Sequence, residues 1–382
     1  MTPPGRVSSR LPQFPWDRLV AHRHRAASHP DGLVDLSVGT PVDEVPLLVR
    51  EALAAGADAP GYPATAGTSA LREAAVDWLA RRCGVRGLSP DAVLPAIGLK
   101  ELVASMALHL GLGPGDLVMV PELAYPTYEV GARLAGCDVI AVDAVPDAGS
   151  RPALVWVNSP ANPTGRVLSA GHLAELVGWA RERGALLVSD ECYVELGWEA
   201  EPVSVLHPDV CGDSHDGVLA LHSLSKRSNL AGFRCGFAAG DATVLAELLA
   251  VRKNLGLMMP APVQHAAAVA LGDDAHVAQQ RDRYASRRGR LLGALDHAGF
   301  TIEHSEAGLY LWATRGESSW STVESLAGKG ILVAPGDFYG PTGARHVRVS
   351  LTASDERVAA AAQRLTQSAE REVPTVQSGT GR

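Results

Sequence analysis

Residues 217–236 read GVLALHSLSKRSNLAGFRCG and carry the most informative pattern in the chain. The first six residues predict a buried strand, and Ser223, Ser225 and Lys226 follow where that strand ends. A lysine flanked by hydroxyls and followed after a glycine-rich turn by Arg234 suits a Schiff-base lysine beside a phosphate site. Taken alone, the same segment could equally be a polar loop that closes a strand.

A second motif, SDECY at residues 189–193, ends another apolar run. It places Asp190 at the carboxyl end of a predicted parallel strand, the edge at which such sheets bind ligands. Pyridoxal phosphate needs an acidic partner for its ring nitrogen, because the protonated ring is the electron sink for the substrate carbanion. Asp190 fits that role, and Tyr193 could hydrogen-bond the phenolic oxygen of the ring. An isolated aspartate here could instead cap a helix.

Short apolar runs alternate with helical patterns along most of the chain, which is typical of a mostly parallel α/β sheet. Predicted strands cover residues 92–97, 117–120, 139–142, 153–158, 185–189 and 217–222, and predicted helices cover 46–59, 69–82, 100–110, 127–135, 169–183 and 242–252. After a long helical stretch at 263–298, the strand-like pieces 301–303, 310–314, 331–334 and 347–351 predict a second, α+β domain. The last helix is expected to end near Ser368, before a polar tail, 369–382, that we expect to be disordered.

A third motif, NSPANPTG at residues 158–165, follows a predicted strand, and its turn would aim the amide of Asn162. By itself it could be a rigid loop. The four motifs N-P-T-G, D-E-x-Y, S-x-S-K and G-x-R-x-G occur in that order, and from about residue 12 to 365 the chain resembles the class I and II aminotransferases of pyridoxal-phosphate fold type I. One departure is Ser159, which stands where the family often has an asparagine.

The resemblance implies an α/β fold whose large domain, 46–270, holds a mostly parallel seven-stranded sheet, with a smaller α+β domain from 11–45 and 271–368. In the family, the loop that matches Gly98, Leu99 and Lys100 offers backbone amides to the phosphate at a helix N-terminus. The remaining implied cofactor contacts are Tyr125, Asn162, Asp190, Tyr193, Ser223, Ser225, Lys226 and Arg234, with Tyr125 stacked on the ring.

Tyr62 matches a tyrosine that reaches the phosphate of the neighbouring subunit, so the resemblance implies a homodimer with shared active sites. Gly39 matches the glycine whose backbone lets the substrate carboxylate approach, and Arg348 matches the arginine that forks the α-carboxylate, beside Asn162. An amino donor would displace Lys226, whose freed amine would then move a proton, so Lys226 acts as nucleophile and general base in turn. With Asp190 and Tyr193 it forms the expected catalytic set, and 2-oxoglutarate would be the acceptor.

Within this family, three segments are similar to the N-succinyldiaminopimelate aminotransferases of the lysine pathway in their high-GC bacterial form. They are LPQFPWD at 11–17, PELAYPTYEVG at 121–131 and SEAGLYLWA at 305–313. An aminotransferase for aspartate or LL-diaminopimelate remains open, as does a carbon–sulfur lyase. A cofactor-sensing domain of a transcription regulator is disfavoured, because only about 30 residues precede the first strand-like segment, at 34–37.

Composition supports an ordinary cytoplasmic enzyme. Of the 382 residues, 46% are hydrophobic and 20% charged, which fits a globular chain. The net charge of -8 offers no basic footprint for nucleic acid or an anionic membrane, and we see no signal peptide or membrane span. The five cysteines lack a C-x-x-C pair and the histidines lack H-E-x-x-H spacing, so we expect neither a disulfide framework nor a metal site.

Overall fold

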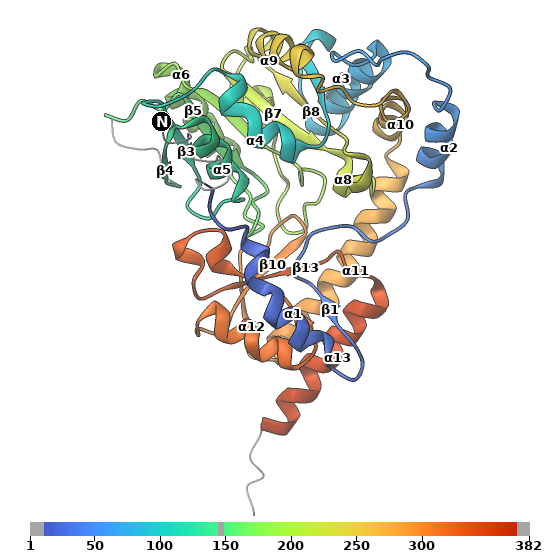
Figure 1. Cartoon of the computed structure of the whole chain (residues 1–382), viewed down its shortest axis with the longest axis vertical. Helices are drawn as coiled ribbons and strands as arrows, with labels where there is room; N and C mark the ends of the chain where they lie inside the picture. Colours follow the sequence, from blue (N-terminus) through green and yellow to red (C-terminus); the bar gives the residue numbers. More distant parts are fainter. Residues whose placement is uncertain (1–10, 144–148, 373–382) are drawn as a thin grey trace, which may run out of the picture.

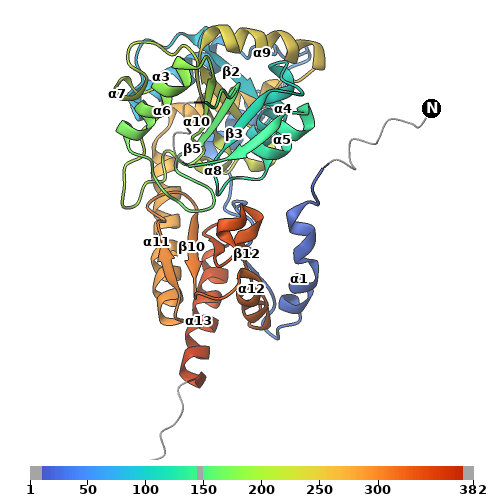
Figure 2. The same cartoon turned by 90° about the vertical axis from the view of Figure 1, so that its left-hand side faces the viewer.

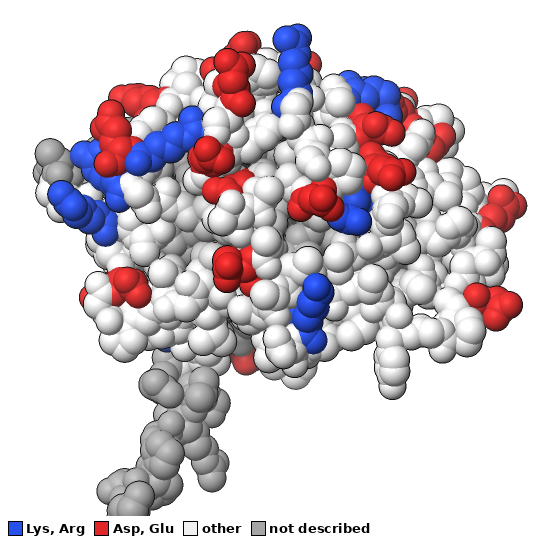
Figure 3. All heavy atoms as spheres, turned by 90° about the horizontal axis from the view of Figure 1, so that it is seen from above, with Lys and Arg blue, Asp and Glu red and all other residues white. Residues whose placement is uncertain are grey.

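A computed structural model describes residues 11–143 and 149–372. In both Figures 1 and 2 the molecule has two parts, a larger upper one built on a wide sheet and a smaller lower one. Among the described residues on the face seen from above, acidic and basic side chains are scattered and mixed (Figure 3). No helix in the described ranges is long and apolar enough to cross a membrane.

The larger part contains a seven-stranded sheet with the order β2-β8-β7-β6-β5-β3-β4. Strand β8 runs antiparallel to β2 and β7, and the other neighbouring pairs are parallel. This confirms the expected α/β fold with a mostly parallel seven-stranded sheet. The strands are β2 (Val93–Ala96), β3 (Leu117–Val120), β4 (Asp138–Ala141), β5 (Leu154–Asn158), β6 (Leu186–Asp190), β7 (Val218–Ser223) and β8 (Gly236–Gly240).

The local sequence does not predict β8, because its residues, GFAAG, are mostly glycine and alanine, which have low strand propensity. Close packing against β7 explains why small residues are needed there. A Cβ added to Gly240 would lie 2.1 Å from the carbonyl oxygen of Val218, and one on Gly236 would lie 2.8 Å from that of His222. Gly240 also has a φ of 138°, which side-chain-bearing residues rarely adopt.

Helices cover both faces of this sheet, and each face has its own apolar core. Successive side chains of β5 point to opposite faces: Val155 and Val157 join one core, whereas Leu154 and Trp156 join the other. The first core is covered by α2 (Leu47–Ala55), α3 (Ser69–Cys83), α6 (Ala170–Glu182), α7 (Pro208–Cys211) and α10 (Ala261–Gly272). The second is covered by α4 (Leu99–His109), α5 (Thr127–Ala135) and α9 (Ala242–Leu255).

The smaller part has a third core around an antiparallel sheet of order β12-β13-β10-β9 and a parallel pair, β1-β11. Its strands are β1 (Val34–Asp35), β9 (Thr301–Glu303), β10 (Tyr310–Thr314), β11 (Ile331–Leu332), β12 (Ala334–Pro335) and β13 (Val347–Ser350). Its helices are α1 (Val20–Ala27), α11 (Ala275–His297), α12 (Ser319–Gly328) and α13 (Asp355–Glu372). Short 3-10 turns lie at Pro15–Leu19, Pro90–Ala92, Ala231–Phe233, Gly336–Phe338 and Pro341–Gly343. We propose the domain limits 46–270, and 11–45 with 271–368, for the two parts.

Three expectations differ from the structure. The helical stretch at 263–298 breaks into α10 and α11, because Asp273 is extended and its carboxylate accepts from the backbone amide of His276. The strand expected at 331–334 divides, with β11 pairing with β1 and β12 with β13. Helix α13 continues to Glu372, past the start of the expected tail, whose remaining residues, 373–382, lie outside the described ranges.

Candidate active site

The carboxyl ends of β5, β6 and β7 meet at the edge of the large sheet that faces the smaller part (Figure 1). Asn158 at the end of β5 pairs in register with Asp190 at the end of β6, and β7 ends at Ser223. A cavity of about 740 Å³ opens at this edge. Its wall includes these predicted site residues: Gly39, Leu99, Lys100, Tyr125, Asn162, Asp190, Tyr193, Ser223, Ser225, Lys226, Arg234 and Arg348.

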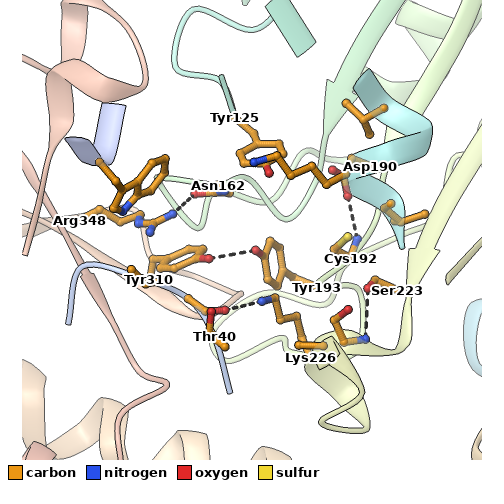
Figure 4. A pocket seen from close by; sticks show the side chains of 18 of the residues that line it. Thr40, Tyr125, Asn162, Asp190, Cys192, Tyr193, Ser223, Lys226, Tyr310 and Arg348 are labelled. Atoms are coloured by element: carbon orange, nitrogen blue, oxygen red, sulfur yellow. Dashed lines mark hydrogen bonds between the residues drawn. The ribbon is translucent and has the colours of Figure 1, made fainter. Parts of the chain in front are cut away.

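Lys226 projects into the cavity from the short helix α8 (Leu224–Arg227), which follows β7 directly (Figure 4). The hydroxyl of Ser223 caps this helix by accepting from the amide of Ser225. The ammonium group of Lys226 donates to the carbonyl oxygen of Gly39. Burial lowers the pKa of Lys226; Tyr310 and Cys192 oppose this shift, and the cations Arg348 and Arg234 add to it. A lowered pKa favours the neutral amine, which is the form that attacks a carbonyl carbon.

Asp190 is a buried carboxylate with two hydrogen-bond donors. Its Oδ2 accepts from the hydroxyl of Tyr128 at 2.8 Å, and its Oδ1 accepts from the amide of Cys192 at 3.2 Å. Burial raises the pKa of Asp190, and the hydrogen bonds from Cys192 and Tyr128 oppose that rise. A cationic group placed in the cavity would stabilise this carboxylate. The protonated ring nitrogen of pyridoxal phosphate is such a group.

Hydrogen-bond donors that could bind an anion lie together where α4 begins beside Arg234. Gly98 precedes the helix with a φ of 82°, and no side chain caps the first amides of α4, which leaves them for another acceptor. A Cβ at Gly98 would lie 2.2 Å from Nη2 of Arg234, so the absence of a side chain there makes room for the guanidinium. Arg234 itself has a φ of 54° and donates from Nη1 to the carbonyl of Ala231. These donors fit a phosphate monoester.

The turn at 158–165 and Arg348 form the opposite wall of the cavity. Asn158 accepts from the amide of Asn162 at 2.7 Å and donates to the carbonyl of Asp190 at 2.8 Å, which ties the turn to the end of β6. Arg348, on β13, donates from Nη1 to Oδ1 of Asn162 and from Nη2 to the carbonyl of Ser37, both at 2.8 Å. Arg348 is 2% exposed, and its Nε has no hydrogen-bond partner among the described residues.

Two tyrosine hydroxyls meet at the centre of the cavity (Figure 4). The oxygens of Tyr193 and Tyr310 lie 3.1 Å apart, and burial followed by the proximity of Tyr310 raises the pKa of Tyr193 well above its usual range. The ring of Tyr310 also lies under the guanidinium of Arg348, with Cζ 3.9 Å from the ring centroid. The sequence predicts no role for Tyr310, Tyr128 or Asn158. Tyr310 and Tyr128 contact Tyr193 and Asp190 across 117 and 62 residues, and Asn158 contacts Asp190 across 32.

The rim of the cavity is partly aromatic. Phe14 and Trp16 of the N-terminal segment line it, and the Lys100 ammonium lies 5.2 Å from the centre of the Phe14 ring. Tyr125 lines the cavity beside Tyr128.

Tyr62 does not belong to this cavity: it is 98% exposed, so the expected contact with a phosphate would require a second subunit. In the described ranges, no group of three or more His, Cys, Asp or Glu side chains could hold a metal ion.

Comparison with known proteins identifies the kind of site. The model of the family "Aminotransferase class I and II" matches residues 31–365. A probable aminotransferase of Mycobacterium tuberculosis, Rv1178, is 64% identical over 363 residues, which cover 95% of this chain and 87% of that protein. The 4-dedimethylamino-4-oxo-anhydrotetracycline transaminase OxyQ of Streptomyces rimosus is 60% identical, covering 93% of this chain and 99% of OxyQ.

Solved structures agree with the fold. A probable N-succinyldiaminopimelate aminotransferase from Thermus thermophilus superposes with a TM-score of 0.84 at 31% identity, covering 93% of this chain and 100% of that one. An aminotransferase from Staphylococcus aureus superposes with a TM-score of 0.85 at 26% identity, covering 96% of this chain and 99% of its own.

Proposed function

Because the chain belongs to the class I and II aminotransferases, a family that depends on pyridoxal phosphate, we propose that it moves the amino group of N-succinyl-LL-2,6-diaminopimelate to 2-oxoglutarate. Enzymes of this family take an amino donor and a 2-oxo acid. The observation that carries the proposal is one cavity that holds a partly buried lysine, a buried carboxylate and a buried arginine, Lys226, Asp190 and Arg348. An amino-acid substrate needs all three kinds of group.

We assign the cofactor contacts by charge and geometry. Arg234, Ser223, Ser225 and the first amides of α4 after Gly98, those of Leu99 and Lys100, would hold the phosphate. Asp190 would face the ring nitrogen, Tyr125 the ring face, and Asn162 with Tyr193 the phenolic oxygen. When bound, pyridoxal phosphate withdraws electrons from the substrate α-carbon and stores the amino group between the half-reactions.

The chain's own residues then supply binding and proton transfer. Lys226 would hold the cofactor covalently in the resting enzyme and, once released, would take the proton from the substrate α-carbon on Nζ and deliver it to C4′ of the cofactor. Its lowered pKa suits that work. Arg348 would bind the α-carboxylate of both substrates, with the backbone of Gly39 in the same cavity wall allowing it to approach. The two half-reactions would then share one site and give ping-pong kinetics.

The choice of donor has two kinds of support. The similar structure from Thermus thermophilus is named a probable N-succinyldiaminopimelate aminotransferase. A protein 34% identical to this chain is named LL-diaminopimelate aminotransferase, which supports the unsuccinylated alternative. Lys100 at the rim would attract the carboxylate of a succinyl group. Aspartate and LL-diaminopimelate as donors, and carbon–sulfur elimination in place of transfer, are the alternatives that the same cavity could serve.

A second candidate substrate class is a polycyclic ketone. OxyQ, at 60% identity, is named for a transaminase reaction on an anhydrotetracycline derivative. The aromatic part of the rim, Phe14 and Trp16, would favour a flat apolar body. Aromatic side chains stack on such surfaces and do not depend on a distal carboxylate.

We further propose a cytoplasmic homodimer with shared sites. Tyr62 is 98% exposed, and the apolar side chains of Leu47 and Val42 are 61% and 59% exposed on the segments that lead to it. A second subunit that covers these side chains would bring its neighbour's Tyr62 towards a phosphate. Burial of exposed apolar groups is a general driving force for association.

A donor panel tests the proposed substrate. The purified enzyme is loaded with pyridoxal phosphate, and the absorbance change of the bound cofactor is followed for N-succinyl-LL-2,6-diaminopimelate, LL-diaminopimelate, aspartate and an aminated anhydrotetracycline. We expect the succinylated donor to have the highest kcat/KM, because donors without the succinyl carboxylate would lose the attraction to Lys100. Equal or better turnover of another donor would reassign the substrate, and release of ammonia and a thiol from cystathionine would indicate a lyase.

A further inference from the structure

Tyr310 is a buried tyrosine that contacts two residues of the site, Tyr193 and Arg348. It begins β10, in the smaller part, and is 4% exposed. Its hydroxyl is 3.1 Å from that of Tyr193, which lies on the loop after β6 in the larger part. Arg348 lies on the neighbouring strand β13, and its Cζ is 3.9 Å from the centroid of the Tyr310 ring. One side chain therefore links the expected carboxylate-binding arginine to the expected partner of the cofactor.

The space around the hydroxyl is shaped for it. A Cβ placed on Gly39 would lie 2.0 Å from the Tyr310 hydroxyl oxygen, so Gly39 leaves the room that this oxygen occupies. The carbonyl of the same glycine accepts from Lys226. Tyr310 is thus held between the lysine-bearing region and Tyr193, with its ring nearly perpendicular to that of Tyr193, at 80°.

We propose that Tyr310 is a positioning residue. Its hydroxyl donates a hydrogen bond to Tyr193 and thereby strengthens the hydrogen bond from Tyr193 to the phenolic oxygen of the cofactor. A tyrosine hydroxyl has one proton to donate and can also accept. If Tyr193 donates to the cofactor, the hydrogen bond between the two tyrosines must run from Tyr310 to Tyr193. A chain of donors polarises each member and strengthens the last bond. This inference rests on the proposed contact between Tyr193 and the cofactor.

The ring has a separate role from the hydroxyl. The aromatic face under Arg348 keeps the guanidinium plane fixed while Asn162 and Ser37 take its two Nη groups. The hydroxyl acts on the cofactor through Tyr193, whereas the ring acts on the substrate through Arg348. Two variants separate these roles: Tyr310→Phe removes only the hydroxyl, and Tyr310→Leu removes both.

The test is the pH midpoint at which the absorbance of the cofactor bound to Lys226 changes. The proton lost at this midpoint is shared by the phenolic oxygen of the cofactor. A hydrogen-bond donor to that oxygen stabilises the negative charge left behind. Loss of the donor therefore makes the proton harder to remove and raises the pH midpoint. Tyr193→Phe should raise it by roughly 0.4 to 1 pH unit, the equivalent of one net hydrogen bond. Tyr310→Phe should raise it in the same direction by about 0.1 to 0.3 unit, because it weakens that bond without removing it.

The double variant decides whether Tyr310 acts through Tyr193. With Tyr193→Phe already present, Tyr310→Phe should cause no further shift. Additive shifts, or an unchanged midpoint in Tyr310→Phe alone, would overturn the inference while leaving the role of Tyr193 intact. An unchanged midpoint in Tyr193→Phe would instead refute the proposed contact between Tyr193 and the cofactor.

Steady-state constants supply the second readout. Tyr310→Leu should raise the KM values of the amino donor and the 2-oxo acid about tenfold, whereas Tyr310→Phe should leave both near the values of the unaltered enzyme. An equal rise in both variants would mean that the hydroxyl, and not the ring, supports Arg348, and would overturn the division of roles.

Discussion

Replacement of Arg348 by lysine keeps the charge and removes the planar fork. In the structure its two Nη groups point in fixed directions, to Asn162 and to the carbonyl of Ser37, each at 2.8 Å, and the side chain is 2% exposed. A lysine ammonium can replace only part of this bidentate geometry. Loss of one charge-assisted hydrogen bond to a substrate carboxylate costs about 1.5–3 kcal/mol, which corresponds to roughly a 10- to 100-fold change in binding.

The assay is an initial-rate study in which amino donor and 2-oxo acid are varied independently. Because both substrates present an α-carboxylate, Arg348→Lys should raise both KM values by about 10- to 100-fold with a smaller effect on kcat. Arg290→Lys, on the exposed surface of α11, is the matched control and should leave both constants unchanged. A rise in only one of the two KM values would refute the shared carboxylate role.

Other expected outcomes address the cofactor, the dimer and the sheet. Asp190→Asn should slow α-proton abstraction at least about 100-fold in single turnovers while circular dichroism stays the same, and an unchanged rate would remove Asp190 from the chemistry. Tyr62→Phe should loosen the cofactor, and mixing it with Lys226→Ala should recover activity through hybrid dimers that have one intact site. Failure to recover it despite verified subunit exchange would argue against a donated tyrosine. Gly240→Ala should destabilise the protein by about 2–4 kcal/mol in denaturant unfolding, because the added Cβ meets the backbone of β7 and the φ of 138° is strained. Gly178→Ala, in the open middle of α6, should be neutral or stabilising, and equal effects of the two would refute the packing explanation.

Much of the site could be predicted because its motifs follow predictable strands. Asp190 and Ser223 end two parallel strands, so their meeting at one edge follows from the topology alone. Asn162 lies in a proline-rich turn just beyond β5, and Arg234 lies in a glycine-rich turn just before β8, where local sequence restricts the backbone. Lys226 follows Ser223 so closely that β7 also determines where it lies.

The site residues that the sequence did not predict contact partners that are far away in the sequence. Tyr310 meets Tyr193 across 117 residues, and Tyr128 meets Asp190 across 62. No local pattern distinguishes either from a core aromatic, since both are buried in apolar surroundings. Strand β8 was not predicted for a related reason. Its glycines are required because the backbone of β7 packs closely against them, and this contact exists only in the folded sheet.

The most direct test of the central claim is the identity of the residue that carries the cofactor. The purified enzyme is reduced with borohydride in the presence of pyridoxal phosphate and digested, and the labelled peptide is sequenced by mass spectrometry. The adduct should be found on Lys226 and on no other lysine. Lys226→Ala should form no adduct, and its activity should fall by at least the roughly 10²–10⁴-fold typical of a missing general base. A covalent adduct that persists in Lys226→Ala, or one placed on Lys100 in the unaltered enzyme, would contradict the account.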